Sequence, residues 1–304
     1  MKKAHKDFNT IDSISELHRF LGLPKPGHPM VSVVNCSEIP DSTSETLTNY
    51  LNSFYIISIK KDFKGKLKYG QQYYDFDEGV MSFIAPGQMI SKTTANHDLG
   101  MSLIFHPDFI RNYPLAGIIK NYGYFSYAVN EALHLSEKEE TMIISLMQNI
   151  EQEYLSAIDS FSQNVIVSQI DLFLNYCNRF YNRQFITRSN ASNDLLVKLE
   201  ILLSTFFDHE NLAEKGLPTV HYISEQLNVS PTYLSDMLRS LTGQNTQQHI
   251  HAKLIEKAKQ MLTTTSLSVS EVAYQLGFEY PQSFNKLFKN KTNVSPLAFR
   301  QSFN

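Results

Sequence analysis

The chain has 304 residues, about twice the ~150 residues expected of one domain, which predicts two domains. Hydrophobic residues make up 42% and charged residues 19% of the chain, so it is not an intrinsically disordered protein. The formal net charge of −3 argues against a uniformly basic nucleic-acid-binding surface. Cys36 and Cys177 are far apart in the sequence, which excludes a disulfide framework and favours a reducing, cytoplasmic location. No signal peptide and no membrane span are expected, because no apolar segment is long enough.

The first part of the chain is predicted to be rich in strands. Between about residues 31 and 135, short runs of β-branched and aromatic residues alternate with Gly, Pro and Asp turn signals. The runs lie at 31–36, 54–59, 66–69, 80–84 and 101–105. Short strands at regular spacing predict a small β-sandwich or barrel.

Two helices are predicted after the strands, within about 136–182. Ser136 to Glu139 has the form of a capping box, which predicts the start of the first helix. The second helix, about Ser162 to Tyr181, is apolar on two faces and has to bury both. One face, with Ile166 and Phe173, can pack on the strands. The other, with Val165, Leu172 and Tyr176, is either a surface for a partner subunit or is covered within the same chain.

The domain boundary is predicted at a polar segment. Residues 184–193 lack apolar periodicity, so a linker is expected there, between a domain at 1–183 and a helical domain at 194–304. The first helix of the second domain is predicted from Asp194 to His209.

The second domain contains an internal repeat. Residues 223–227 align with 272–276, and residues 234–243 align with 284–293, so the offset is 49 to 50 residues. Each copy predicts a short helix, a turn and a second helix that ends in Thr-Gly or Thr-Asn, which suit a left-handed C-cap. This is the plan of a helix-turn-helix motif, and Ser230 followed by Pro231 predicts the start of one second helix.

A helix is predicted between the two copies. Residues 244–262 contain no helix breaker, and these 19 residues would span roughly 28 Å. Successive major-groove segments on one face of DNA are about 34 Å apart. The predicted helix could therefore place two recognition helices in neighbouring grooves, whereas a helical bundle that happens to be duplicated is the alternative.

The last 85 or so residues resemble the DNA-binding domain of the AraC/XylS family of bacterial transcription regulators. The matching segments are Ser268–Phe278, Ser283–Lys289 and Val294–Arg300, and the first copy matches less well. The resemblance implies a cytoplasmic, homodimeric, sequence-specific regulator, more often an activator, that binds double-stranded DNA and, as an activator, RNA polymerase. It implies no catalytic activity.

The resemblance also implies which residues contact DNA. The base contacts fall on the N-terminal half of each second helix. They are Thr232, Ser235 and Asp236 in the first copy and Pro281, Gln282, Asn285 and Lys286 in the second. Gln and Asn can pair with adenine and Lys with guanine, so we expect the second copy to dominate specificity. Asp236 could accept from cytosine or simply repel phosphate. Arg239, Lys289 and Lys291 are expected to contact phosphates.

Residues 73–88 resemble the cupin-like barrel that precedes the DNA-binding domain in many members of this family. The metal ligands of metal-binding cupins are missing, since His97 and His106 are not spaced as a ligand set, and no metal or cofactor is expected. The family implies a small-molecule effector, such as a sugar or another metabolite. Tyr55, Tyr69, Tyr73 and Tyr74 could stack on it or fill the core. A regulator without an effector and a cupin-type enzyme fused to a DNA-binding module are the alternatives.

The charge is divided unequally between the two domains. Residues 217–304 hold eight basic and five acidic residues, a net charge of +3, so the remainder carries −6. Beyond Glu279 there are four basic residues and no acidic one. DNA contact is therefore predicted to be local and modest in charge, and to depend on pairing two chains.

Overall fold

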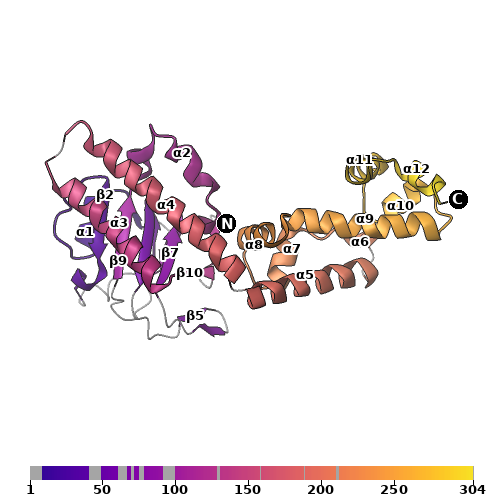
Figure 1. Cartoon of the computed structure of the whole chain (residues 1–304), viewed down its shortest axis with the longest axis horizontal. Helices are drawn as coiled ribbons and strands as arrows, with labels where there is room; N and C mark the ends of the chain where they lie inside the picture. Colours follow the sequence, from indigo (N-terminus) through magenta and orange to yellow (C-terminus); the bar gives the residue numbers. More distant parts are fainter. Residues whose placement is uncertain are drawn as a thin grey trace, which may run out of the picture. The chain divides into compact units, whose positions relative to one another are not determined.

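The computed structural model describes residues 9–40, 49–60, 67–69, 72–74, 79–91, 100–128, 131–157, 159–187, 189–209 and 212–303. The chain divides into two compact units, Met1–Gln184 and Phe185–Asn304, which we call the N-terminal domain and the C-terminal domain. All strands among the described residues lie in the N-terminal domain, and the C-terminal domain is helical (Figure 1). The predicted fold class, a sheet-rich region followed by an all-helical one, is confirmed.

The described strands form two main sheets and a hairpin. The larger sheet is antiparallel and contains, in spatial order, β10 (Leu133–His134), β7 (Val80–Ile84), β4 (Tyr55–Lys60), β9 (Gly100–Phe105) and β2 (Val31–Asn35). The smaller sheet contains β1 (Asn9–Ile11), β3 (Asn49–Asn52) and β8 (Met89–Ser91). The hairpin pairs β5 (Leu67–Tyr69) with β6 (Gln72–Tyr74). Each of the five predicted runs contains a strand.

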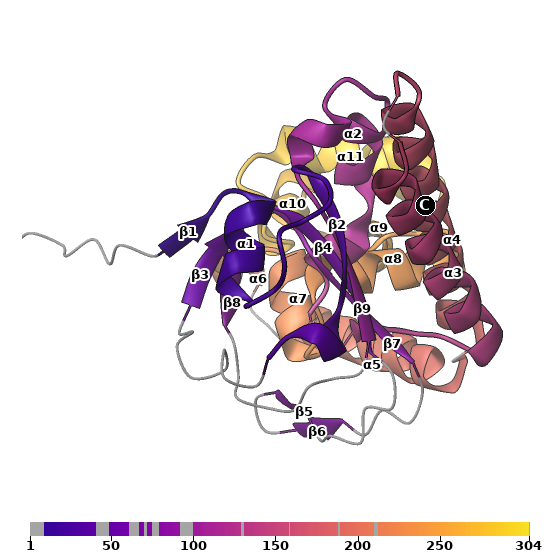
Figure 2. The same cartoon turned by 90° about the vertical axis from the view of Figure 1, so that its left-hand side faces the viewer.

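The two faces of the larger sheet are buried against different layers, as the alternation of side chains along a strand allows. One face packs against the smaller sheet and α1 (Ile14–Phe20). The hydrophobic cluster there consists of Ile11, Ile14, Leu17, Val34, Tyr50, Phe54, Ile56 and Ile104. The other face, which includes Ile57 and Leu103, is covered by helices α3 (Glu137–Leu155) and α4 (Ser162–Thr187) (Figure 2). Two facing sheets match the sandwich alternative, and closure into a cupin-like barrel stays a prediction.

Helix α3 (Glu137–Leu155) begins as predicted. Ser136 and Glu139 form a complete capping box, because the Ser136 side chain accepts from the Glu139 N–H and the Glu139 carboxylate accepts from the Ser136 N–H. At the other end of α3, the Tyr154 hydroxyl accepts from the N–H of Val33 in β2 at 3.0 Å. This bond ties the helix to the sheet.

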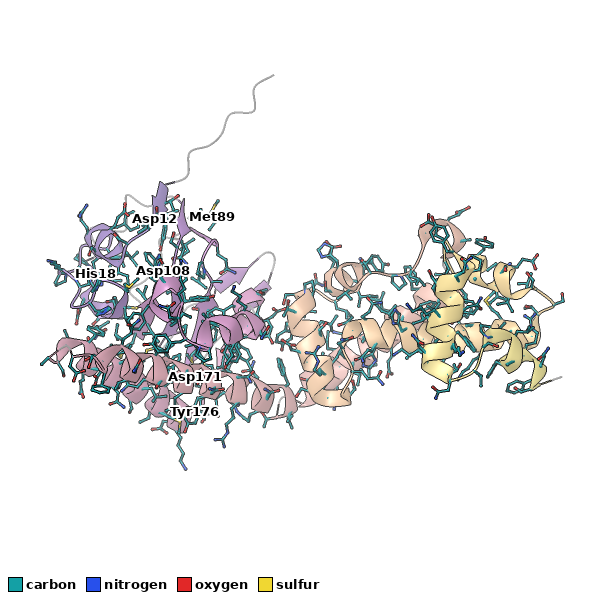
Figure 3. The ribbon with its side chains drawn as sticks, turned by 90° about the horizontal axis from the view of Figure 1, so that it is seen from above. Asp12, His18, Met89, Asp108, Asp171 and Tyr176 are labelled. Carbon is teal, nitrogen blue, oxygen red and sulfur yellow. The ribbon has the colours of Figure 1, made fainter. Side chains whose placement is uncertain are left out.

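Helix α4 (Ser162–Thr187) is longer than predicted. The side chain of Gln184 accepts from the His134 N–H at 2.8 Å and donates to the Ala132 carbonyl at 3.2 Å, so the end of α4 is tied to β10. On α4, Asp171 and Tyr176 lie on the side of the N-terminal domain away from Asp12 and Met89 (Figure 3).

The segment expected to be a linker is helical. Residues 184–187 end α4 and residues 189–193 begin α5 (Ser189–His209), which starts five residues before the predicted Asp194; Arg188 lies outside the described residues. Polar composition is a poor indicator of a linker here, because Gln184 is both buried and hydrogen-bonded and Ser192 is buried. Gln184 and Ser192 are both less than a tenth exposed.

The rest of the C-terminal domain is a series of short helices around one long helix (Figure 1). They are α6 (Leu212–Lys215), α7 (Val220–Gln226), α8 (Pro231–Thr242), α9 (Thr246–Thr264), α10 (Val269–Gln275), α11 (Pro281–Thr292) and α12 (Pro296–Gln301). Among the described residues, no helix has the length and apolar character needed to cross a membrane.

Candidate nucleic-acid interface

Two helix-turn-helix units form in the C-terminal domain at the positions of the sequence repeat. We call α7 with α8 the first unit and α10 with α11 the second unit. Helix α9 joins them and has 19 residues, as predicted, although it begins at Thr246 rather than at residue 244. The later start follows from Asn245, whose side chain caps the helix in a capping box with Gln248.

The first unit is positioned by local capping signals. Ser230 caps α8 and Pro231 occupies its first position, as the sequence predicts. The helix ends at Gly243, which adopts the left-handed conformation with φ of 76°. The buried side of α8 consists of Leu234, Met237 and Leu238, which are fully buried, so the opposite side of the helix faces outward.

The second unit has the same plan, with a glycine in its turn. Ser268 and Glu271 form a capping box on α10, and α11 ends at Asn293 in the left-handed conformation. Gly277 has φ of +82°, and a Cβ at this position would lie 2.6 Å from the carbonyl oxygen of Leu212. Only glycine fits both conditions, so this turn holds α10 and α11 against the helix that precedes the first unit.

The core of the second unit is aromatic. The rings of Phe278 and Phe288 lie 5.4 Å and 5.7 Å from that of Phe284, between centroids, and Phe299 of α12 lies 5.5 Å from Phe288. Arg300 donates from Nε to the carbonyl of Leu262, at the end of α9, at 2.9 Å. This packing orients α11 rigidly, as a recognition helix requires.

The candidate base-contact residues of the first unit are engaged within the protein. The hydroxyls of Ser235 and Thr246 are hydrogen-bonded at 2.9 Å, which joins α8 to α9. Asp236 accepts from the guanidinium of Arg239 at 2.8 Å. Thr232 is half-buried. The sequence-predicted base contact Asp236 and phosphate contact Arg239 are therefore partners of each other.

The candidate base-contact residues of the second unit face solvent. Pro281, half-buried, is the first residue of α11, and Gln282, Asn285 and Lys286 are exposed at positions that share one side of the helix. Within the described part of the chain, none of these three exposed side chains has a hydrogen-bond or ion-pair partner. Their donors and acceptors are available to an external ligand.

The basic residues at the end of α11 extend this surface. Lys289 and Lys291 are exposed in its last turn, where the helix dipole favours positive charge. Burial and then the nearby positive charge of Lys291 lower the pKa of His251 on α9. Lys291 therefore lies near α9, and the positive charge of the second unit continues from α11 toward it.

The tyrosines predicted to line an effector site divide into two groups. The ring of Tyr55 stacks on Phe105 and meets Phe125 edge-on, each at 5.1 Å between centroids, and its burial raises the pKa of its hydroxyl. These ring contacts favour the core alternative for Tyr55, whose side chain is half-buried. Tyr69, Tyr73 and Tyr74 lie on strands β5 and β6, and their side chains are outside the described residues, so an effector role for them stays a prediction.

The histidines considered as metal ligands have other surroundings. His106 caps a short turn by accepting from the Asp108 N–H, and His97 lies outside the described residues. On α9, His249 meets the hydroxyl of Thr242 and His251 meets the side chain of Gln247, both at 2.9 Å. Within the residues described, no three His, Cys, Asp or Glu side chains form a group that could hold a metal ion.

The sequence indicates Gly277 as the turn of the second unit, but it does not indicate Thr246 as a residue that positions the interface. The ion pair of Asp236 with Arg239 has the i, i+3 spacing of neighbours on a helix, so its signal was present in the sequence. The bond of Ser235 to Thr246 joins two helices, and no local pattern reveals it.

Comparisons with known proteins match the same part of the chain. A family model described as a helix-turn-helix domain matches residues 223–302. The HTH-type transcriptional activator RhaS of Escherichia coli is 32% identical over 79 residues, which are 26% of this chain and 28% of RhaS. The uncharacterized HTH-type transcriptional regulator YfiF of Bacillus subtilis is 25% identical over 164 residues, 54% of this chain and 49% of YfiF.

One solved structure is similar over the C-terminal region alone. The C-terminal domain of the two-component response regulator YesN from Fusobacterium nucleatum is 31% identical, with a TM-score of 0.29 and coverage of 33% of this chain and 96% of that domain. The chain spans about half, or less, of the two curated relatives described above. The matched segment contains both helix-turn-helix units and the helix between them. The C-terminal region of this chain belongs to the AraC-type helix-turn-helix family.

Proposed function

We propose that the chain is a sequence-specific DNA-binding transcription regulator. The observation that carries the proposal is the exposed side of α11, where Gln282, Asn285 and Lys286 offer hydrogen-bonding groups that no described residue occupies. Amide side chains pair with adenine and lysine with guanine in the major groove. A recognition helix with these groups at its N-terminal half is suited to direct base readout.

The two units would bind neighbouring segments of the groove. Helix α9, with 19 residues, spans roughly 28 Å, close to the ~34 Å that separates successive major-groove segments on one side of DNA. A single chain would then contact about one helical turn of DNA at two places.

The second unit would provide most of the base specificity. The Asp236 carboxylate of the first unit is paired with Arg239, and the Ser235 hydroxyl is bonded to Thr246. Contact with DNA from either side chain would have to break or share an existing bond. The first unit is therefore proposed to contribute mainly to docking, through Thr232 and the helix backbone.

Dimerisation is proposed through the helices at about 136–182. The apolar side chains of Phe161, directly before α4, and of Val165 and Leu172 on α4 are 68%, 39% and 47% exposed, and they follow one side of the helix with Tyr176. The opposite side, with Ile166, Ile170 and Phe173, is buried. Two copies could cover the exposed side by packing α4 against α4. Leu172→Glu should then shift the chain toward monomer in analytical ultracentrifugation, whereas Glu at the exposed polar position Asn178 should not.

The N-terminal domain is proposed to sense a small molecule, such as a sugar or another metabolite, or to serve only as the dimerisation platform. As an activator the protein would also contact RNA polymerase, and it would act in the cytoplasm. A cupin-type enzyme fused to a DNA-binding module is the competing proposal, and stoichiometric metal in the purified protein would favour it.

Selection of DNA from a random pool by the full chain tests the proposed function. We expect enrichment of a defined sequence, and retention of that sequence in a gel-shift assay when excess unrelated DNA is present. Binding that depends on salt but not on sequence would contradict the proposal, because phosphate contacts alone give that result.

A further inference from the structure

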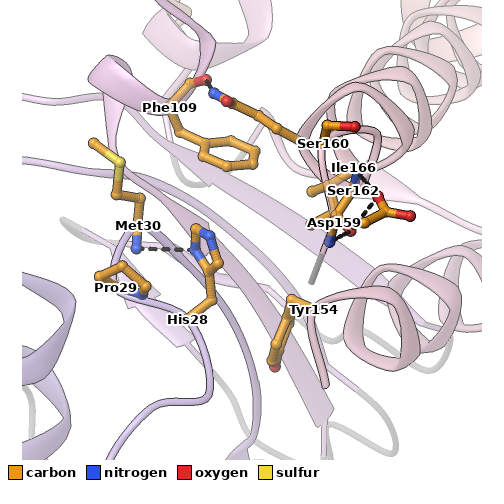
Figure 4. Close-up of a pocket in the computed structure, with 10 residues that line it drawn as sticks. His28, Pro29, Met30, Phe109, Tyr154, Asp159, Ser160, Ser162 and Ile166 are labelled. Carbon is orange, nitrogen blue, oxygen red and sulfur yellow. Dashed lines mark hydrogen bonds between the residues drawn. The ribbon is translucent and has the colours of Figure 1, made fainter. Parts of the chain in front are cut away.

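A pocket of about 320 Å³ lies in the N-terminal domain, at the turn between α3 and α4. It is lined by His28, Pro29, Met30, Phe109, Tyr154, Asp159, Ser160, Ser162, Gln163 and Ile166. His28 and Pro29 lie on one side, the turn that carries Asp159 lies on the other, and Phe109 and Tyr154 lie between them (Figure 4). Its volume is within the range of small-molecule sites.

The walls of the pocket are apolar and firmly held. Phe109, Tyr154 and Ile166 are almost fully buried, and the rings of His28 and Phe109 meet edge-on at 5.3 Å between centroids. The hydroxyl of Tyr154 is bonded to the backbone of Val33, so the ring presents an apolar surface to the pocket. These walls suit a flat apolar group.

His28 contributes no positive charge to the pocket. Its Nδ1 accepts the Met30 N–H at 3.1 Å, which leaves the proton of the neutral ring on Nε2. Burial lowers the pKa of His28, so the neutral form predominates at pH 7.

Asp159 contributes a negative charge. Its Oδ1 accepts the Phe161 N–H at 2.7 Å and the Ser162 N–H at 3.0 Å, at the start of α4. These hydrogen bonds, that from Phe161 first, lower the pKa of Asp159 and keep it ionised at neutral pH. No described residue donates to Oδ2, and the exposed Asp159 side chain lies at the rim of the pocket, turned away from His28 and Phe109 (Figure 4).

We propose that this pocket binds a small organic cation, an amine carried on a single ring or a similar apolar group. The apolar group would lie between Phe109, Tyr154 and Ile166, and the ammonium would extend to the rim of the pocket and pair there with the exposed carboxylate of Asp159. A neutral His28 and an ionised Asp159 give the pocket a net negative charge, which favours a cation over a carboxylate of the same shape. None of the tyrosines considered above as effector contacts, Tyr55, Tyr69, Tyr73 and Tyr74, is among the residues that line this pocket.

The position of the site suggests its use. Asp159 caps the first turn of α4, and α4 carries the exposed apolar side proposed above for dimerisation. A role as effector site rests on that proposed function, whereas ligand binding to the pocket does not.

Three probes with the same carbon skeleton separate charge from shape: 2-phenylethylamine, 2-phenylethanol and phenylacetate. Titration calorimetry with the full chain should give saturable binding of the amine, with a Kd of about 0.1–10 mM for so small a ligand. The alcohol should bind about tenfold more weakly, because a charged hydrogen bond is lost. Phenylacetate should not bind measurably.

Asp159→Asn removes the charge and retains the helix cap, because Asn is also a favoured N-cap residue. It should weaken amine binding about tenfold and leave binding of the alcohol unchanged. Asp171→Asn makes the same change elsewhere on α4 and should leave amine binding unchanged.

A fluorescent reporter locates the binding. The sequence contains no tryptophan, so Phe161→Trp places a single one beside the pocket. Its emission should change with the calorimetric Kd. Absence of saturable amine binding, equal binding of phenylacetate, or equal losses in Asp159→Asn and Asp171→Asn would overturn the site. A gel-shift assay of the same samples measures DNA binding independently, so failure of amine binding can be distinguished from failure of the proposed function.

Discussion

The second helices of the two units, α8 and α11, have the same length, but the side chains at corresponding positions differ in whether they have partners within the chain. In α8 the side chains of Ser235 and Asp236 bond to Thr246 and Arg239 of the same chain. In α11 the corresponding surface, with Asn285 and Lys286, is exposed and has no partner among the described residues. A shared backbone plan therefore does not imply a shared role. Helix α8 is hydrogen-bonded to α9, whereas α11 exposes the side chains for which base contacts are proposed.

We expect the largest loss of DNA affinity from substitutions in α11. Replacing both Asn285 and Lys286 with alanine removes two base contacts, each worth about 1–3 kcal/mol, so affinity for the selected DNA should fall about 30-fold or more. Gel-shift titration measures the loss. Gln301→Ala, which removes an exposed amide on α12 outside both units, is the control and should bind normally. Intact binding by the double variant, together with loss in Ser235→Ala, would reverse the ranking of the two units.

Two glycines with positive φ, Gly277 in the turn of the second unit and Gly243 at the C-cap of α8, differ in how strictly the structure requires them. At Gly277 a Cβ would lie 2.6 Å from a backbone oxygen, whereas nothing lies within 4 Å of a Cβ at Gly243, although both residues have positive φ. Gly243→Ala should cost about 1–2 kcal/mol in the free energy of unfolding. Gly277→Ala should cost more, about 2–4 kcal/mol, because the backbone also has to move. Denaturant unfolding measures both, and equal losses would show that the turn at Gly277 is not tightly packed.

A smaller change, an increase in DNA affinity, is expected from a substitution in the first unit. Asp236→Asn removes a negative charge near DNA and releases Arg239, so affinity for unrelated DNA should rise a few-fold, and the salt dependence should steepen by about one counterion. Fluorescence anisotropy at several salt concentrations measures both. Glu225→Gln removes the same charge at an exposed position of α7 and is the control for net charge. A fall in affinity for the selected DNA alone would instead indicate that Asp236 accepts from cytosine.

The smallest effect concerns the capping box of the second unit. Hydrogen bonds from the side chain and the backbone N–H of Ser268 lower the pKa of Glu271. A lowered pKa means that the contribution to stability is present above the unfolded pKa and is lost as the pH falls through the folded one. Amide exchange in α10 should therefore speed up below about pH 4.5 relative to the core. Glu271→Gln retains the box without titrating, and unchanged acid sensitivity in this variant would assign the effect elsewhere.

Local signals account for what the sequence predicted well. Ser136 with Glu139, Ser230 with Pro231, and the left-handed C-caps at Gly243 and Asn293 each depend on residues a few positions apart, and each forms as expected. The start of α9 was misplaced by two residues because Asn245, a capping residue, was counted inside the helix.

Long-range contacts account for what the sequence did not predict. Residues 184–187 and 189–193 are helical despite the polar composition of this segment, since Gln184 bonds to β10 and Ser192 is buried. The pocket near His28 combines three segments, around residues 28, 109 and 154–166, which only the fold brings together. The sequence left two roles open for Asp236, and its ion pair with Arg239 limits which groups it can contact.

A base-substitution scan of the selected DNA site tests the central claim most directly. Each position is replaced in turn, and the affinity of the full chain is measured at fixed salt. We predict two clusters of sensitive positions about one helical turn apart. One should have losses of about 1–3 kcal/mol per position and respond to Asn285→Ala, and the other should have smaller losses. A single cluster, or two clusters of equal sensitivity that ignore Asn285→Ala, would contradict the assignment of base readout to α11.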